Sequence, residues 1–415
     1  MKRLLAAALV VIVLSATSAC GSGEPEATPP QSSSAAQPTQ GSPSASETDS
    51  ATPVEVSGLN SKMASAAAGF QHTCALTTGG DIWCWGRNRL GQLGNGNIQD
   101  SATPVEVLGL NGSATALVAG DRHNCALTRE GGVKCWGSNS RGQIGDGTPN
   151  HKVEAVDVIG LASGVSAIAS GTEHVCALTT GGGVTCWGQN GVGQLGDGTT
   201  EDRKEPVKVS GLDQRVTAVA TSEDHSCAVI ATGAVKCWGA NDRGQLGNGT
   251  TTSSSTPNST PVEAVVLKDP VVAVAVGPLD TCVLTTAGRV KCWGGNRHGQ
   301  LGDGTTTDNL VPVDVAGLAS GVVTIGLGRS YACVLTKAGA VKCWGANDRG
   351  QLGDGTTTDR TAPVGVSGLD SGVVALTVGT SHSCAVASDG GMMCWGRNDV
   401  GQLGDGSGGA DDGGS

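Results

Sequence analysis

Fourteen of the fifteen cysteines fall into seven pairs, and the two cysteines of each pair stand ten residues apart. The pairs are Cys74 and Cys84, Cys125 and Cys135, Cys176 and Cys186, Cys227 and Cys237, Cys282 and Cys292, Cys333 and Cys343, and Cys384 and Cys394. A hairpin that turns midway between two such cysteines places them opposite each other on neighbouring strands. Opposed Cα atoms lie about 4.5–5.5 Å apart, which is within disulfide reach. The spacing therefore predicts seven disulfides.

Metal binding is the alternative chemistry for paired thiols, but zinc needs four converging ligands and each pair supplies only two. A histidine precedes the first cysteine by two residues in five of the seven copies, and Asp280 and Tyr331 take this place in the other two. These histidines are His72, His123, His174, His225 and His382. Equivalent positions around a ring lie too far apart to share one ion. We expect each histidine to make a hydrogen bond within its own repeat, and we expect neither a metal site nor a cofactor.

The cysteine pairs belong to a longer repeat, because Cys-Trp-Gly recurs at intervals of 51, 51, 51, 55, 51 and 51 residues. In the third copy, four short segments have the β-branched content and turn spacing of strands. These segments are 165–169, 174–178, 184–187 and 206–209. Seven successive units of four antiparallel strands are typical of a β-propeller. The pattern thus predicts an all-β, seven-bladed propeller of four-stranded antiparallel blades.

Two further residue types recur once in each repeat. The tryptophan of Cys-Trp-Gly is expected to pack between blades. The Gly-Gln-Leu/Ile-Gly motif ends in Asp-Gly or Asn-Gly, which is typical of a turn that needs a positive φ. Calcium binding would need more carboxylates in each loop than this one.

The two ends of the repeat array complement each other. The last copy stops near Gly406 without a Pro-Val strand, whereas a spare one, Pro53–Val56, precedes the first copy. We predict that this N-terminal strand completes the last blade and closes the ring, since an open array would leave unpaired edges. The expected domain covers residues 51–406, and residues 407–415 form a flexible Gly/Asp tail.

The first fifty residues are predicted to contain an export signal followed by a linker. A basic start and an apolar run over 4–14 predict a signal peptide over 1–19. Ala16 to Cys20 resembles a bacterial lipobox, with Thr17 at the usual leucine position, so Cys20 is expected to carry a lipid. The alternative is ordinary cleavage nearby, which leaves a free thiol. Residues 20–50 would form a disordered Ser/Pro-rich linker with a reach of about 30 Å. The expected location is the outside of a bacterial cell membrane or outer membrane.

Composition excludes several classes of function. The formal net charge of −11 argues against nucleic-acid binding. No apolar run reaches the roughly 18 residues that a membrane span needs, so membrane contact would come only through the lipid. No nucleophile with its base, carboxylate dyad or phosphate-binding loop stands out from the repeat. We therefore expect a protein that is not an enzyme.

The strings His-x-Cys-Ala-Leu-Thr and x-Trp-Gly-x-Asn-x-x-Gly-Gln-Leu-Gly, with the Pro-Val strand, resemble the regulator of chromosome condensation repeat family over residues 51–406. The cysteine pairs and the export signal indicate an exported bacterial, cysteine-rich branch. The resemblance implies a propeller, but one fold hosts unrelated activities. Three functions compete: a non-catalytic protein-binding module, an inhibitor of an extracellular enzyme, and nucleotide exchange on a small GTPase. The scarcity of aromatic anchors disfavours the inhibitor, and export disfavours the GTPase regulator.

Function should lie where the repeats differ from one another, in the loops between their first and second and between their third and fourth strands. Within Trp-Gly-x-Asn-x-x-Gly the variable positions hold seven arginines against three aspartates, Asp242, Asp348 and Asp399. The arginines are Arg87, Arg89, Arg141, Arg243, Arg297, Arg349 and Arg397. Because guanidinium groups bind carboxylates in a planar fork, these residues predict a binding face for an acidic protein partner. The alternative is a solvated loop face. A monomer is expected.

Overall fold

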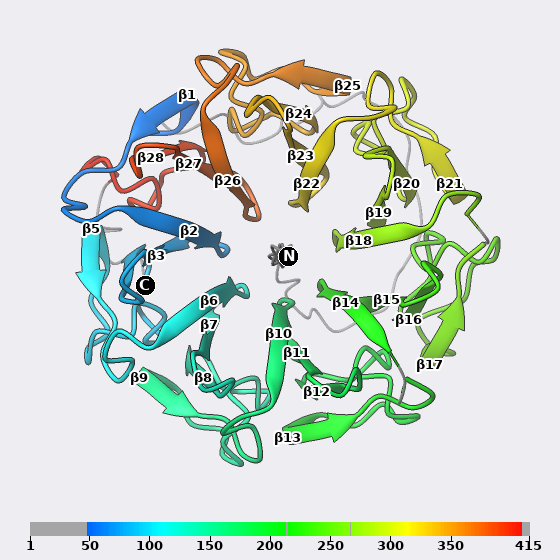
Figure 1. Cartoon of the computed structure of the whole chain (residues 1–415), viewed down its shortest axis with the longest axis horizontal. Coiled ribbons are helices and arrows are strands. Elements are labelled where there is room, and N and C mark those ends of the chain that lie inside the picture. The colour runs from blue at the N-terminus through cyan, green and yellow to red at the C-terminus, as the bar shows by residue number, and fades with distance from the viewer. Residues whose placement is uncertain (1–47, 213–214, 266, 409–415) are drawn as a thin grey trace, which may run out of the picture.

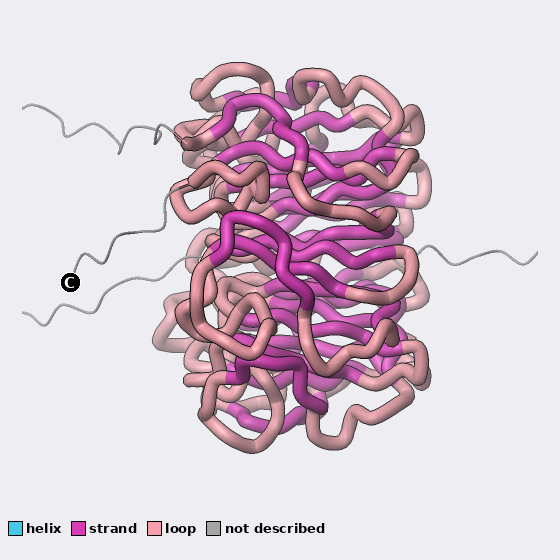
Figure 2. Tube along the Cα trace, turned by 90° about the vertical axis from the view of Figure 1, so that its left-hand side faces the viewer, coloured by secondary structure: helices cyan, strands magenta, loops and turns pink. Residues whose placement is uncertain are grey.

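Seven four-stranded antiparallel sheets surround a common axis and form a propeller (Figure 1). The computed structural model describes residues 48–212, 215–265 and 267–408, and these contain 28 strands and no helix. Figure 2 shows the strands running between two faces that consist of loops. The predicted fold class is confirmed. Since the described residues form no helix, none of their segments is a helix that could cross a membrane.

The strands fall into four positions within the blades. The first strands are β2 (Met63–Ala68), β6 (Ala114–Ala119), β10 (Val165–Ser170), β14 (Val216–Thr221), β18 (Val271–Val276), β22 (Val322–Leu327) and β26 (Val373–Val378). The second strands are β3 (His72–Thr77), β7 (His123–Thr128), β11 (His174–Thr179), β15 (His225–Ile230), β19 (Asp280–Thr285), β23 (Tyr331–Thr336) and β27 (His382–Ala387). The third strands are β4 (Ile82–Gly86), β8 (Val133–Gly137), β12 (Val184–Gly188), β16 (Val235–Gly239), β20 (Val290–Gly294), β24 (Val341–Gly345) and β28 (Met392–Gly396). The fourth strands are β5 (Ser101–Glu106), β9 (Lys152–Asp157), β13 (Arg203–Lys208), β17 (Asn258–Glu263), β21 (Asn309–Asp314), β25 (Arg360–Gly365) and, for the last blade, β1 (Ser50–Glu55). Blade 1 is β2–β5, and the others follow in chain order to blade 7, which is β26–β28 with β1.

Each strand's composition follows from its place in the blade. The first strands surround the axis (Figure 1) and carry only uncharged, mostly small side chains, as in MASAAA of β2 and VVAVAV of β18. The second strands are buried almost throughout, because neighbouring blades cover both faces of the sheet. The fourth strands are partly exposed along almost their whole length and carry most of the charged residues of the strands, and all but β9 contain a proline. These are features that discourage pairing with other chains at an edge.

The sequence placed the first three strands of blade 3 to within one residue, but it placed the fourth strand too late. β13 begins at Arg203 rather than at Pro206. Proline lacks an N–H and therefore looked like a strand start. The chain instead shifts register there, so that Val207 lies opposite Cys186 and Arg203 lies opposite Gly188.

All seven predicted disulfides are present. Cys176 lies directly opposite Cys186 across the hairpin of β11 and β12, and the other six pairs repeat this register. The Cα atoms of the paired cysteines are 4.0–4.1 Å apart. Every paired cysteine is fully buried. A disulfide therefore joins the two middle strands in the interior of each blade.

The N-terminal strand closes the ring as predicted, since β1 pairs with β28 and completes blade 7. The closure extends beyond the strand. The Asn398 N–H donates to Asp49 Oδ1 at 2.9 Å, and Thr48 Oγ1 donates to the Asn398 carbonyl at 3.0 Å. In blade 3 the same place is filled by Asp202, which accepts from the Asn190 N–H at 2.8 Å. Residues 48 and 49 thus belong to the repeat, just before the expected boundary at 51.

Candidate functional site

Adjacent blades are joined by the repeat tryptophan. All seven tryptophans of Cys-Trp-Gly are fully buried, which confirms their predicted packing. Each indole Nε1–H donates to the backbone carbonyl of the Gly-Gln-Leu/Ile-Gly glutamine in the preceding blade, at 2.8–3.1 Å. The glycines that end the Asp-Gly and Asn-Gly pairs have positive φ, between 78° and 88°, as the turn prediction requires.

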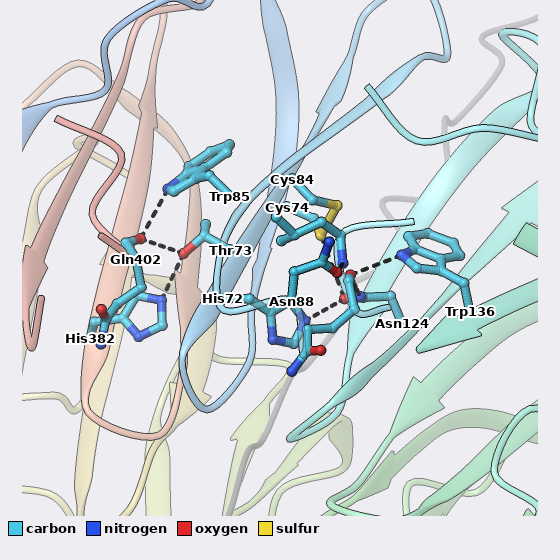
Figure 3. Close-up of a disulfide and its surroundings, with 12 residues drawn as sticks. His72, Thr73, Cys74, Cys84, Trp85, Asn88, Asn124, Trp136, His382 and Gln402 are labelled. Carbon is cyan, nitrogen blue, oxygen red and sulfur yellow. Dashed lines mark hydrogen bonds between the residues drawn. A yellow bond between two sulfur atoms is a disulfide. The ribbon is translucent and has the colours of Figure 1, made fainter. Parts of the chain in front are cut away.

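The histidines add a second bond to this contact (Figure 3). His72 Nε2 lies 2.9 Å from Asn124 Oδ1, and Asn124 Nδ2 donates to the Gln92 carbonyl that Trp136 also reaches. The same arrangement, with Ser, Thr or Asn as the middle group, joins blades 1 and 2, 3 and 4, 4 and 5, and 7 and 1. The expected bond within the repeat is present only at His225, whose Nδ1 lies 3.1 Å from Ser222 Oγ of the same blade. The prediction is wrong for the other four histidines, and the Nε2 atoms of all five bond to the next blade.

The chemistry of these bonds sets the protonation state of the histidines. Ser226 Oγ and Thr281 Oγ1 donate to glutamine carbonyls, so each must accept a hydrogen bond from the Nε2–H of its histidine. Burial lowers the pKa of His72 to about 4 and that of the other four histidines to about 3. All five are fully buried and serve the contacts between blades. Within the described residues, no three His, Cys, Asp or Glu side chains are grouped so that they could hold a metal ion.

The contact between blades 5 and 6 departs from this pattern. Asp280 stands at the histidine position, and Ala332 stands where the next blade should offer a hydroxyl or amide. Asp280 is buried, and neither carboxyl oxygen reaches a side-chain partner among the described residues. Burial raises the pKa of Asp280 well above its usual value, and the Leu279 N–H offsets only part of this effect. Blades 6 and 7 are joined differently, through the Tyr331 hydroxyl and Ser383 Oγ at 3.0 Å.

We expect Asp280→Asn to stabilise the propeller in a manner that depends on pH. The folded state keeps the Asp280 carboxyl protonated, whereas the unfolded chain ionises it above about pH 4, so wild-type stability falls as pH rises. Relative to wild type, the variant should gain about 1.4 kcal/mol for each pH unit above this point, until the folded carboxyl also ionises. Denaturant unfolding at pH 5 and pH 8 measures the difference. The same substitution at the exposed Asp370 is the control, and a gain that does not change with pH would contradict the prediction.

A second set of buried side chains shapes the loops on one face, here called the loop face. It carries the connections between first and second strands and between third and fourth strands. The asparagine of Trp-Gly-x-Asn is buried in every blade. In blade 3, Asn190 Oδ1 accepts from the Leu195 N–H, and Asn190 Nδ2 donates to Asp197 Oδ1 and to the Thr199 carbonyl. Each long loop is thus held from within, and only its variable side chains project outward.

Three of the seven predicted binding arginines bridge neighbouring blades. Arg141, Arg243 and Arg349 occupy the third variable position and reach Asp202, Asp308 and Asp49 of the next blade at 3.2–3.4 Å. Those aspartates also cap the asparagine N–H of their own loops. His298 takes the same position in blade 5 and lies 2.9 Å from Asp359. These side chains have a structural role that the sequence did not reveal.

The other four predicted arginines lie at the first and second variable positions. Arg87 Nη1 donates to Gln71 Oε1, and Arg89 lies 3.9 Å from Asp100. Arg397 bonds to Asp399, and its guanidinium stands 5.3 Å from the centre of the Phe70 ring. Arg297 is exposed and makes no hydrogen bond or ion pair with any residue that the structure describes.

The loop face is hollowed over blades 4 to 7 into a basin of about 630 Å³, which is within the size range of small-ligand sites. Four of the predicted arginines line this basin: Arg243, Arg297, Arg349 and Arg397. Arg87, Arg89 and Arg141 lie outside it. The lining includes Gly295 and Ala346, which are small residues at the first variable position, where blades 1 and 7 carry arginine.

Among the charged lining residues of the basin that were missed from the sequence are Arg329 and Glu223. Both belong to the short connections between first and second strands, in blades 6 and 4. The signal was present, because the two residues before the second strand differ in every blade, from Phe70-Gln71 to Arg329-Ser330. Burial and the nearby Asp224 raise the pKa of Glu223 to about 7, although Arg329 acts in the opposite direction.

Acidic side chains concentrate on another part of the loop face, over blades 3 and 4. Burial raises the pKa of Glu173, and burial together with Asp242 raises that of Asp224 to about 6. Glu223 stands between this acidic group and Arg329, and both affect its charge. The loop face therefore has an acidic side and an arginine-lined side that meet at Glu223.

Known proteins share this architecture. The sequence profile of the RCC1-like domain matches residues 17–329, and the regulator of chromosome condensation (RCC1) repeat matches residues 338–386. The chain is 32% identical over 359 residues to the ultraviolet-B receptor UVR8 of Arabidopsis thaliana, which covers 84% of this chain and 80% of the receptor. Human WBSCR16 has a similar structure, with a TM-score of 0.68 and 26% identity over 82% of this chain and 88% of that one. Prp20p of Saccharomyces cerevisiae has the same fold at 20% identity, with a TM-score of 0.67 over 80% of this chain and 81% of that one. With profile matches over most of its length and a relative that is 32% identical, this chain belongs to the regulator of chromosome condensation (RCC1) repeat family.

Proposed function

We propose that this protein is a non-catalytic interaction module that binds another protein through its loop face at the bacterial cell envelope. The observation that carries this proposal is the basin over blades 4 to 7. It lies where the blades differ from one another, and it is built on loops that buried asparagines, ion pairs and disulfides hold in place. A preformed site of this kind loses little conformational entropy when a partner binds.

Proteins of the same fold support a binding role. Prp20p has binding properties to Gsp1p and histones. A second structure shows yeast RCC1 bound to Kap60. In this chain the described part of the loop face offers arginines, Phe70 and Leu279 as contacts, and arginine and aromatic residues are enriched among the side chains that dominate binding energy.

The disulfides support a location outside the cytoplasm. Seven disulfides in one domain indicate an oxidising compartment. The proposed signal peptide over 1–19, the lipid on Cys20 and the linker lie outside the described residues, apart from residues 48–50. Together they would tether the propeller to a membrane from its N-terminal end, which joins the loop face at Asp49.

Affinity capture tests the proposal. The full oxidised chain is used as bait against the envelope fraction and culture fluid of its own cells, beside the double variant Arg297→Glu and Arg329→Glu. We expect a partner that wild type retains and the double variant loses, because two charge reversals in the basin should weaken binding by about a hundredfold or more. Quantitative mass spectrometry measures the retention.

The matched control reverses an arginine on the opposite face. Arg289 lies in the hairpin turn between β19 and β20 of blade 5. Arg289→Glu should therefore capture the partner as well as wild type does. If all three baits capture the same proteins equally, the loop face is not the binding surface. If none captures a protein, the interaction role itself is wrong.

Cys20→Ser tests the tether independently of binding. Wild type should sediment with membranes and yield a Cys20 peptide with a mass increase from acyl chains. The variant should appear in the soluble envelope fraction, since its serine cannot accept the lipid and no membrane-spanning helix occurs among the described residues. An unmodified Cys20 in membrane-associated wild type would contradict the lipid anchor.

A further inference from the structure

The arginines that line the basin differ in whether their charge is matched by a carboxylate of the chain itself. Arg243 lies 3.4 Å from Asp308, Arg349 lies 3.2 Å from Asp49, and Arg397 bonds to Asp399. The basin therefore already contains three guanidinium–carboxylate pairs, together with the pair of His298 and Asp359. Of the carboxylates that line it, Asp308 and Asp359 are used in these contacts, and Asp348 lies 3.9 Å from Arg349.

Arg297 is the exception among these lining arginines. At the second variable position, Asp242 and Asp348 stand beside the arginine that follows them, and Asp399 bonds to Arg397. Blade 5 carries Arg297 at this position and a histidine after it, and the histidine's partner Asp359 belongs to blade 6. Arg297 consequently lines the basin without a carboxylate partner among the described residues, and Arg329 of blade 6 lines the same basin.

The wall of the basin beside these arginines is partly apolar. Pro278 and Leu279 line it, and Leu279 is 38% exposed. The lining also includes the small residues Gly295 and Ala346, which leave room for a ligand. A guanidinium group beside an apolar wall suits a ligand with a carboxylate on a short carbon chain, because the fork pairs with the carboxylate and the methylene groups contact the wall.

We propose that the basin binds a carboxylate group of an acidic ligand, with Arg297 as the first contact and Arg329 as the second. This inference rests on the proposed function in that it names the chemical group that the loop face recognises. The same group occurs on an acidic peptide segment of a protein partner and on a small dicarboxylic acid. The experiment distinguishes these two sources.

Glu223 adds a pH dependence to this site. The charged groups that face it are Asp224 on its own loop, Glu173 of blade 3 and Arg329 of blade 6. The other titratable groups that line the basin are the arginines Arg243, Arg297, Arg349 and Arg397 and the paired side chains Asp308, Asp348, His298 and Asp359. With a pKa of about 7, Glu223 gains a proton between pH 8 and pH 6. Ligand carboxylates stay ionised over this range. Protonation of Glu223 thus removes a negative charge from the basin and favours the anionic ligand at the lower pH.

Calorimetric titration of the full oxidised chain tests the proposal with two probes, glutarate and hexaglutamate. We expect at least one probe to bind, and the double variant Arg297→Gln and Arg329→Gln to bind it about tenfold or more weakly. Binding of glutarate identifies a small-molecule site, and binding of hexaglutamate alone identifies a peptide site. The matched control is Arg289→Gln on the opposite face of blade 5, which should bind as wild type does.

A single variant and a pH series test the proposal further. The single variant Arg297→Gln should lose most of the affinity, and near-ultraviolet circular dichroism verifies that each variant is folded. Wild-type affinity should rise about threefold or more from pH 8 to pH 6, and Glu223→Gln should abolish this rise while keeping the affinity found at pH 6. If neither probe binds, if wild type and the double variant bind equally, or if inorganic phosphate binds more tightly than both probes, the carboxylate site is wrong. If glutarate binds but no protein is captured, the proposed protein-binding function is wrong, whereas the carboxylate site stands.

Discussion

When denaturant is removed in the presence of a reductant, the chain is expected not to refold. Each disulfide closes a loop between cysteines ten residues apart and contributes at most about 2.7 kcal/mol in the chain-entropy description. Seven such loops amount to about 19 kcal/mol, which exceeds the roughly 5–15 kcal/mol stability of a typical domain. Circular dichroism and resistance to protease, measured after refolding with and without reductant, give the result.

Burial of the sulfur atoms determines how this experiment must be carried out. All fourteen cysteines are fully buried, so the folded chain should resist the same reductant until denaturant opens it. A graded control is the double substitution Cys282→Ala and Cys292→Ala in blade 5. This variant should fold and lose about 2–3 kcal/mol of stability. A fully reduced chain that refolds to a cooperative, protease-resistant state would show that packing and inter-blade hydrogen bonds suffice without disulfides.

The second large effect is loss of stability in mild acid. Five histidines are buried as neutral imidazoles with pKa values of about 3 to 4, whereas the unfolded chain protonates them near pH 6.5. A group whose pKa is lower in the folded state makes the unfolded state bind more protons, so stability falls as pH falls below about 6.5. Each histidine contributes about 1.4 kcal/mol for each pH unit in this range.

Four carboxyls oppose this trend, because Glu173, Glu223, Asp224 and Asp280 have raised pKa values and are protonated first in the folded state. Between about pH 6 and pH 4.5 the unfolded chain therefore gains a net excess of about two protons. Stability should fall by about 3 kcal/mol for each pH unit there, and more steeply below it, where the unfolded carboxyls also become protonated. Denaturant unfolding at a series of pH values, with disulfides intact, measures the slope.

One histidine can be removed to test the assignment. His225→Gln keeps a side-chain N–H that can donate to Thr281, but it takes up no proton on unfolding. The variant should therefore show a pH slope smaller by about 1.4 kcal/mol for each pH unit. Equal slopes in wild type and His225→Gln would mean that the buried imidazoles do not govern the acid sensitivity.

The two effects have a common origin in how the blades are joined. Within a blade the two middle strands are cross-linked by a disulfide, and between blades the bond from His225 to Thr281 and the bond from Trp293 to the Gln245 carbonyl tie one sheet to the next. This framework is largely the same in every blade, so it carries no specificity for a partner. The binding site is instead expected where the sequence departs from the repeat, at Arg297, Arg329 and Glu223.

The sequence by itself determined the architecture. Period-51 repetition, short β-branched segments and Gly-rich turns specified four strands in each blade and seven blades, and the spare Pro53–Val56 segment specified how the ring closes. The ten-residue spacing specified the disulfides. These features are local, or they recur seven times, so each copy supports the interpretation of the others.

Only the tertiary structure decided what the variable side chains do. Arg141 and Asp202 are 61 residues apart in the chain, and Arg349 and Asp49 are 300 residues apart, so no local pattern reveals that they are paired. The same holds for His72 and Asn124, which bond across two blades. The basin itself arises because small residues in blades 5 and 6 lie beside arginines from blades 4 to 7. The repeat sequence determines the contacts that all blades have in common. Whether Arg297 has a carboxylate partner depends instead on which side chains of neighbouring blades lie beside it in the closed ring.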